Sequence, residues 1–510
     1  MMVATGLRGD YGCVTQVPKP QSGGTLKEDF GKEGHYMKIE SACTSILVGK
    51  NASIDGTTMI ARNDDTFHVL SPHRFYMHPA WKGEKGLTVK SPLNKFEATL
   101  PENGYRYNAV PNVDTEHEGD YEESGINEKN VAMSATESTY GNERALGYDP
   151  LVVDGLDEDL MVNMVLPFIE SARHGVEYLG QLIKQYGSPA GNSVLFSDKD
   201  NVWYMEIVTG HHWVAQRIPD DAYAVAANQV AIQQVDFNDP DNFIWSEGIQ
   251  EFVEEHHLNT DKEGFNFRHI FGTMNEKDRH YNTPRVWYAH TILSPDLDDP
   301  QNPESADLPF IMHTNHLITR EDIAQVLGSH YNETEFDPLG HGSDADKYCY
   351  RPIGLNRTQN SHILQARDGA ESIMWLNIGV PTYSPYVPFY TNAQDTDPSY
   401  NQTPMEFDVD KDSAYWMHRE LGMLVESHYN HFIQQNRDYL TELNRRFRVH
   451  IAETDAATAE LTGDELTEAL TAANYKLVAM VKAETKKQIA SYVMQGLELS
   501  KLTFNMDKNL

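Results

Sequence analysis

The chain is poor in cysteine and in long apolar runs, and each shortage excludes a class of protein. Its 510 residues contain three cysteines, Cys13, Cys43 and Cys349. They are too widely spaced for a CxxC zinc ribbon or a thioredoxin-type redox pair. So few thiols in so long a chain favour a reducing compartment without a disulfide framework. No unbroken apolar stretch approaches the length that a membrane-spanning helix needs, so the sequence predicts no membrane partner.

Positive charge is also scarce. The sequence has 41 Lys and Arg against 76 Asp and Glu, which gives a formal net charge of −35 at pH 7. Nucleic-acid binding needs a Lys/Arg-rich footprint, and none appears, so the charge argues against a nucleic-acid partner. The start of the chain lacks the charged and apolar regions of a signal peptide. An acidic surface of this kind predicts a cytoplasmic protein, and we expect a homo-oligomer.

Several familiar functional motifs are missing. The sequence contains no HExxH zinc motif, no GxSxG nucleophile elbow, no P-loop and no GxGxxG turn. It also lacks the Gly and Glu spacing of a calcium-binding EF-hand. The 22 histidines are scattered along the chain and form no ligand pattern. These absences predict a protein without a metal or an organic cofactor.

The chain divides into three parts by composition. Residues 1–42 begin with a Gly-rich stretch that has neither helical nor strand periodicity, and we interpret them as a flexible leader or a removed propeptide. Met37 is an alternative start. Residues 43–405 mix strand and helix patterns and are predicted to form the catalytic domain. Residues 406–510 are helical by periodicity and are expected to pack on that domain as an extension.

The strand and helix patterns predict an α+β fold. Short β-rich runs occur at 43–49, 57–63, 130–138, 361–367 and 372–379. Two helical segments follow the third run, the second of them with Ser171 as N-cap and Gly187 as C-cap. Four further runs between residues 193 and 229 are separated by short turns and predict one antiparallel meander. Residues 235–345 are acidic and predicted to be rich in loops.

Cys43 has neighbours that suggest chemistry. It follows the small residue Ala42 and opens the strand run "CTSILVG". If the residues before it were removed, its free α-amine, with an unperturbed pKa of about 8, would lie within reach of the thiol as a base. Buried cysteines in strands are common, however, so a thiol that only packs in the core is the competing interpretation.

The next strand run ends in "ARNDD", and this ending strengthens the argument that Cys43 belongs to a catalytic site. Antiparallel pairing would bring its guanidinium and carboxylates beside the start of the first strand. Arg62 could then lower the pKa of the Cys43 thiol, and an aspartate could hold the α-ammonium or orient a substrate. The competing interpretation is an Arg–Asp ion pair at a strand end, which would contribute little to stability.

These residues belong to a set of motifs that recurs in order in a known family. "ACTSILVGKNASIDGTTMIARNDD" resembles the opening of the cysteine dipeptidase family of N-terminal-nucleophile (Ntn) hydrolases. "GINEKNVAMSATES" from Gly125, "VWYMEIVTGHHWVAQRIPDDAYAVAANQ" from Val202, "YNTPRVW" from Tyr281 and "YRPIGLNRTQNSHILQAR" from Tyr350 agree with it. The resemblance implies an αββα sandwich of two antiparallel sheets between helix layers. It also implies metal-free hydrolysis of small peptide substrates by Cys43.

The resemblance assigns roles to individual residues. Bile-salt and penicillin V acylases are more distant relatives, and their pattern implies Cys43, Arg62, Asp65 and Asn228 as catalytic residues. Asp64 is then a neighbour. Asn228 matches an oxyanion-side asparagine of those relatives, and Arg285 matches their second arginine.

The sequence departs from the acylase pattern at one place. Where those relatives have a further asparagine, this chain has "SATES", which leaves Thr136 or Glu137 as the candidate second oxyanion donor. For substrate binding, we expect Arg285 to take the carboxylate of a dipeptide and Glu137 its ammonium. The alternatives at this point are an acylase-type amidohydrolase of N-acyl amides, a non-catalytic peptide-binding relative and a metallopeptidase.

Overall fold

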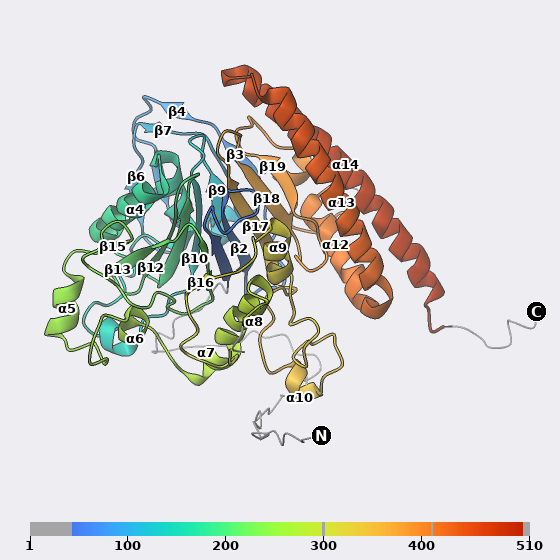
Figure 1. Ribbon diagram of the computed structural model, residues 1–510. Coiled ribbons are helices and arrows are strands. Elements are labelled where there is room, and N and C mark those ends of the chain that lie inside the picture. Colours follow the sequence, from blue (N-terminus) through green and yellow to red (C-terminus); the bar gives the residue numbers. More distant parts are fainter. Residues whose placement is uncertain (1–42, 298–300, 410–411, 503–510) are drawn as a thin grey trace, which may run out of the picture.

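Two antiparallel sheets stacked face to face form the body of the molecule, with helices on both outer faces (Figure 1). The computed structural model describes residues 43–297, 301–409 and 412–502. The predicted leader, 1–42, lies outside the described residues. Contacts of β2 with β10, β11 and β12 join the two sheets. The arrangement confirms the predicted αββα sandwich. None of the described helices is long and apolar enough to cross a membrane.

The seven-stranded sheet carries the start of the described chain at its centre. Its order is β16-β14-β1-β2-β17-β18-β19, and every pair is antiparallel. The strands are β1 (Thr44–Val48), β2 (Thr58–Asp65), β14 (Ala222–Ala226), β16 (Ile311–His313), β17 (Thr358–Ala366), β18 (Ile373–Ile378) and β19 (Val387–Tyr390). β1, β2 and β17 are buried along their whole length, as expected of strands covered on both faces.

The six-stranded sheet faces it, in the order β15-β13-β12-β11-β10-β9. Its strands are β9 (Ser124–Ile126), β10 (Ala132–Glu137), β11 (Asn192–Ser197), β12 (Val202–Ile207), β13 (Trp213–Ile218) and β15 (Phe243–Trp245). Side chains alternate across this sheet. Val194 and Phe196 join an apolar cluster with α3 and α4, while Leu195 joins the core that includes the other sheet.

Short strand pairs occur between β2 and β9 in the sequence. They are β3 (Tyr76–His78) with β8 (Tyr107–Ala109), β4 (Trp81–Lys82) with β7 (Asn103–Gly104), and β5 (Thr88–Lys90) with β6 (Glu97–Thr99). The helices up to the end of the sandwich are α1 (Thr115–Glu118), α2 (Glu143–Leu146), α3 (Glu158–Val165), the 3-10 turn η1 (Leu166–Phe168), α4 (Ala172–Tyr186), α5 (Ile249–Glu255), α6 (Phe267–Phe271), α7 (Glu276–Tyr281), α8 (Thr283–Leu293), α9 (Arg320–Leu327), α10 (Asp344–Lys347) and α11 (Pro398–Asn401).

Different helices cover the outer faces of the two sheets. α3 and α4 pack on the six-stranded sheet, whereas α8 and α9 pack on the seven-stranded one (Figure 1). α4 begins at the predicted N-cap, where Ser171 accepts a hydrogen bond from the backbone N–H of His174, and it ends at the predicted Gly187. Gly187 has φ +71°, a left-handed conformation that favours glycine at a helix end.

One prediction about the middle of the chain is wrong. The four-stranded meander is split, because β14 leaves β11–β13 after a short turn and pairs with β1 in the other sheet. That crossover lets Asn228, just beyond β14, reach the start of β1. The described part of residues 235–345 contains five helices, α5 to α9, separated by the loops that the sequence predicted. Their short length and acidic loops obscure their periodicity.

The predicted helical C-terminal region is present as α12 (Ala414–Ser427), α13 (Tyr429–Thr458) and α14 (Gly463–Glu498). The three helices pack on one another along one edge of the molecule (Figure 1). α12 contacts β18, and α14 contacts β19, the edge strand of the seven-stranded sheet. They therefore cover a sheet edge that would otherwise expose unpaired backbone groups.

Candidate active site

Cys43 and Arg62 lie together at the start of β1. The register of β1 with β2 pairs Ser45 with Arg62. Residues two apart in a strand point to the same face, which puts Cys43, two positions before Ser45, on the side of Arg62. The Nη1 of Arg62 lies 3.0 Å from the Cys43 Sγ, and both residues are fully buried. The predicted pairing of these two strands therefore brings the guanidinium to the thiol.

Three residues that the sequence did not single out hold Arg62 in place. Its Nη2 forms an ion pair with the Glu123 carboxylate, and its Nε donates to the Ser134 hydroxyl over 2.8 Å. Ser134 in turn contacts the Nε2 of His362 at 3.0 Å. Ser134 and His362 belong to β10 and β17, so the guanidinium crosses the space between the two sheets. Ser134 lies in the segment "SATES" and His362 in "SHILQAR". These two motifs were the sequence signals that could have identified them.

Burial dominates the electrostatics of the thiol. It raises the pKa of the Cys43 thiol to about 12, against the opposing effect of the Arg62 charge. Burial also acts to lower the pKa of Arg62, but the Cys43 thiolate and Glu123 hold that pKa well above its usual value. Among the described residues, the hydrogen-bond partner of Sγ is Arg62, and no histidine takes that place. The thiol therefore needs another base to become a nucleophile.

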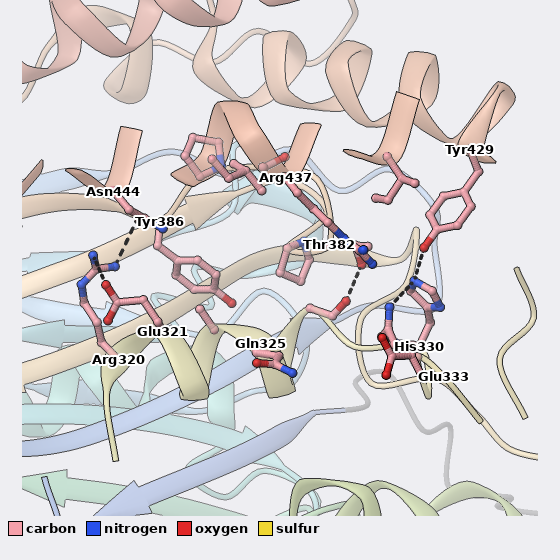
Figure 2. Close-up of a pocket in the computed structure, with 18 of the residues that line it drawn as sticks. Arg320, Glu321, Gln325, His330, Glu333, Thr382, Tyr386, Tyr429, Arg437 and Asn444 are labelled. Atoms are coloured by element: carbon pink, nitrogen blue, oxygen red, sulfur yellow. Dashed lines mark hydrogen bonds and ion pairs between the residues drawn. The ribbon is translucent and has the colours of Figure 1, made fainter. Parts of the chain in front are cut away.

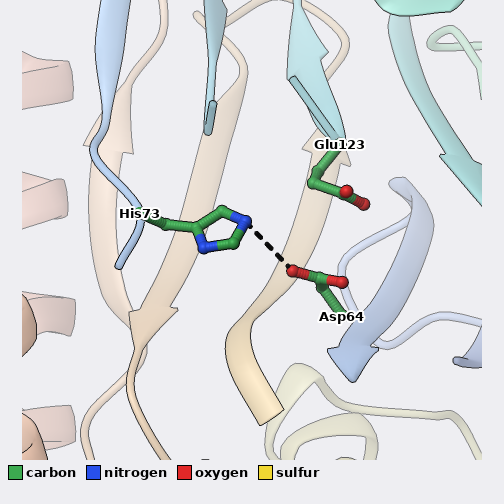
Figure 3. Close-up of side chains that lie close together, drawn as sticks. All are labelled: Asp64, His73 and Glu123. Atoms are coloured by element: carbon green, nitrogen blue, oxygen red, sulfur yellow. Dashed lines mark ion pairs between the residues drawn. The ribbon is translucent and has the colours of Figure 1, made fainter. Parts of the chain in front are cut away.

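Behind Arg62 lies a buried acidic cluster formed by Asp64, His73 and Glu123 (Figure 3). The Nε2 of His73 lies 3.2 Å from the Asp64 Oδ2, and the Asn360 amide donates to the same oxygen over 2.9 Å. Burial raises the pKa of both carboxyl groups to about 7 and lowers that of His73. Near neutral pH these two carboxyl groups therefore titrate, and the cluster shares protons.

The same three side chains are the candidate metal ligands of the described residues. One ligand atom from each lies within 4.8 Å of the others. Glu123, however, is already paired with the Arg62 guanidinium, and Asp64 already accepts from Asn360. A metal ion would sit against a fixed positive charge and would have to displace both partners. These residues fit a proton-sharing cluster better than a metal site.

Asp65 lies in a separate ionic group. It pairs with the Arg351 guanidinium and accepts a hydrogen bond from the Thr358 hydroxyl. Arg351 lies 5.1 Å from the Tyr281 ring centre, and Arg285 lies 5.2 Å from the same ring. Among the described residues, Asp65 thus pairs with Arg351 and Thr358 and not with Arg62.

Asn228 and Arg285 form the opposite side of the Cys43 environment. The Arg285 Nη1 donates to the Cys43 carbonyl over 2.7 Å, and its Nη2 donates to the Asn228 Oδ1 over 2.7 Å. Further hydrogen bonds join Arg285 to Thr44, Tyr281 and Asn282. With its nitrogens engaged in this way, Arg285 is fully buried and holds the Asn228 side chain by its amide oxygen. Burial lowers its pKa to about 9.

Thr136 and Glu137 end β10 on different faces. Thr136 shares the face of Ser134, which binds Arg62, and its buried hydroxyl has no hydrogen-bond partner among the described residues. Glu137 is half-buried, and its backbone is fixed: its N–H donates to Glu158, and its carbonyl accepts from Asn228. Thr136 is the better placed of the two for a ligand near Cys43.

A second cysteine and a separate cleft complete the inventory. Cys349 Sγ lies 3.8 Å from the Nδ1 of His280 in α7, so it is a second thiol in contact with an imidazole. A cleft of about 450 Å³ opens between α9 and α13 (Figure 2). Tyr386 and Arg320 line it, and none of the predicted site residues does. The residues predicted for catalysis therefore gather at the start of β1, away from this cleft.

Comparison with known proteins identifies the family. The model of Peptidase family C69 matches residues 42–442. A "Probable dipeptidase" of Latilactobacillus sakei is 54% identical over 474 residues, with 92% of this chain and 98% of that protein covered. A "Probable dipeptidase B" of Lactococcus lactis is 41% identical over 92% of this chain and 100% of that protein. A "Dipeptidase A" of Lactobacillus helveticus is 38% identical over 92% and 99%.

A solved structure of a mutant conjugated bile acid hydrolase from Clostridium perfringens covers 66% of this chain and 89% of its own, at 12% identity and a TM-score of 0.31. The fold assignment rests on the strand order given above. The family match begins one residue before Cys43 and extends through β1, β2, β14 and α8, which carry the residues around the thiol. The chain is a cysteine-type peptidase and belongs to Peptidase family C69.

Proposed function

We propose that this protein is a dipeptidase in which Cys43 is an N-terminal nucleophile and no metal takes part. The observation that carries the proposal is the buried contact between the Cys43 thiol and Arg62, at the start of a central strand. The names of the relatives support dipeptides as substrates. The occupied ligand atoms of the acidic cluster support a reaction without metal.

The chemistry begins with the removal of the residues before Cys43. The new α-amine accepts the thiol proton, and the ammonium formed beside sulfur adds to the charge of Arg62 in stabilising the thiolate. Sulfur attacks the scissile carbonyl, and the ammonium returns the proton to the leaving amine as the C–N bond breaks. Water then attacks the acyl-enzyme and gives a proton to the α-amine of Cys43. This step releases the N-terminal amino acid of the dipeptide and restores the thiol.

Asn228 is the proposed oxyanion donor in this reaction. Its Nδ2 donates one hydrogen to the Glu137 carbonyl over 3.3 Å, which leaves its second hydrogen for a developing oxyanion. Removal of one such donor typically costs about 100- to 1,000-fold in rate. Arg285 keeps Asn228 in this orientation through its 2.7 Å hydrogen bond and is therefore a positioning residue. Thr136 remains the proposed second polar contact.

Asp65 is proposed to act through the arginines. It holds Arg351 beside Tyr281 and Arg285, the group that contacts the Cys43 carbonyl. A substrate carboxylate would find Arg285 already engaged, so this geometry favours support of the nucleophile over capture of the substrate.

The test uses both described cysteines. Cys43→Ala and Cys43→Ser should lose nearly all turnover of a dipeptide, while Cys349→Ala should keep it and serves as the matched control. Intact-mass analysis of the active protein should show a chain that begins at Cys43. A fully active chain that still carries Ala42 would overturn the α-amine mechanism. Turnover of penicillin V or a bile-salt conjugate in preference to a dipeptide would favour the acylase-type activity instead.

A further inference from the structure

Glu158 is a buried carboxylate with one unsatisfied oxygen. It is the first residue of α3 and is 3% exposed. Its Oε2 accepts a hydrogen bond from the Glu137 backbone N–H over 2.7 Å. Its Oε1 is buried and has no hydrogen-bond partner among the described residues. Burial raises the pKa of this carboxyl well above its usual value, and a cationic donor that arrives from outside the chain would relieve the cost of its unpaired oxygen.

A short series of hydrogen bonds connects Glu158 to the nucleophile. The Glu137 carbonyl accepts from Asn228 Nδ2 at 3.3 Å, and Asn228 Oδ1 accepts from Arg285 at 2.7 Å. Arg285 then donates to the Cys43 carbonyl. Glu158 also lies close enough for its charge to raise the pKa of the Cys43 thiol. The carboxyl group is therefore linked to the nucleophile by this series of contacts and lies within electrostatic reach of the thiol.

The geometry of a dipeptide puts its α-ammonium close to Cys43, so a carboxylate that binds the ammonium must also lie there. In a dipeptide the α-ammonium nitrogen and the scissile carbonyl carbon are bonded to the same Cα, which puts them about 2.5 Å apart. A sulfur poised for attack lies about 3–3.5 Å from that carbon. The ammonium must therefore come to rest within about 6 Å of Cys43 Sγ. A group that recognises a free amino end has to be a neighbour of the nucleophile.

We propose that Glu158 binds the α-ammonium of the dipeptide through its Oε1 and so makes the enzyme require a free amino end. This assignment rests on the proposed function and gives Glu158 the role expected of Glu137. The Glu137 backbone then serves as the clamp that fixes Glu158, since its N–H holds the other carboxylate oxygen. The side chain of Glu137 leaves β10 on the face opposite Ser134 and Thr136, which lie toward Arg62.

Turnover of paired substrates tests this role. Wild type and Glu158→Gln are compared on alanyl-alanine and on N-acetyl-alanyl-alanine, which has no ammonium. Glu158→Gln should lower kcat/KM for the free dipeptide by about 10- to 150-fold, the effect of one hydrogen bond to a charged group, and leave the slow acetylated substrate nearly unchanged. Asp159→Asn is the matched control, because it removes a buried carboxylate from the same helix that bonds Ser91 instead.

A binding measurement separates this proposal from the proposed function. The hydroxyethylene isostere of alanyl-alanine has no bond to cleave, and calorimetry reports its affinity for the full-length protein. It should bind wild type about 10- to 150-fold more tightly than Glu158→Gln, and its N-acetyl derivative should bind both equally. Equal weakening of both ligands, or a free isostere that binds wild type no better than its acetylated form, would overturn the role of Glu158. Dipeptide turnover that survives Cys43→Ala would overturn only the mechanism.

Discussion

Replacement of Arg62 by methionine should destabilise the protein in a pH-dependent way. Arg62→Met keeps most of the side-chain volume but leaves the Glu123 carboxylate buried without its ion-pair partner. Loss of one partner of a buried pair typically costs about 3–5 kcal/mol. Protonation of Glu123 limits that loss, because burial already raises the pKa of this carboxyl to about 7 with Arg62 present, and each pH unit above that value adds about 1.4 kcal/mol. The ceiling on the loss through Glu123 is therefore near zero at pH 6 and about 1.4 kcal/mol at pH 8.

Urea unfolding at the two pH values measures this difference, and a second substitution checks its cause. Arg62→Met/Glu123→Gln removes the stranded charge and should recover most of the stability lost at pH 8. The double variant should stay inactive, because the thiolate still lacks the guanidinium at 3.0 Å. Alkylation of Cys43 by iodoacetamide at fixed pH should slow about 10- to 150-fold in both variants. A double variant that is as unstable as Arg62→Met, or one that regains turnover, would refute this account.

Two further substitutions give distinct outcomes. Asn228→Ala should lower kcat by about 100- to 1,000-fold with little change in KM, and steady-state kinetics on a dipeptide measure it; a change confined to KM would contradict an oxyanion role. Asp64→Asn tests the acidic cluster by pH. Burial raises the folded pKa of Asp64 to about 7, above an unfolded value of about 3.9. The folded state therefore binds the extra proton, and the free energy of unfolding falls as pH rises from about 4 to about 7. Asp64→Asn should reduce that slope by up to about 1.4 kcal/mol per pH unit, as measured by urea unfolding; an unchanged slope would show that Asp64 does not titrate there.

The sequence predicted local features and linear motifs far better than it predicted contacts across the sandwich. The strands that begin at Cys43 and end at Asp65 carry strong β-formers and turn residues, so their pairing and the approach of Arg62 to the thiol followed from local pattern. The crossover of β14 did not follow, because a short turn is compatible with either sheet. Glu123 and Glu158 also escaped notice. Both are acidic residues in polar stretches, and only the stacking of two sheets and α3 buries them.

The buried carboxyl groups around Cys43 favour the entry of a positively charged group. Asp64, Glu123 and Glu158 are three buried carboxyl groups near the thiol, and Arg62 is the cation that contacts this group. Burial, aided by the mutual repulsion of the carboxylates, raises the pKa of each. An environment with a surplus of buried carboxyl groups stabilises any ammonium that enters it. The proposed reaction brings two, the α-ammonium of Cys43 and that of the dipeptide. The same surplus disfavours an N-acylated substrate, which supplies no positive charge, and thereby favours a dipeptidase over an acylase.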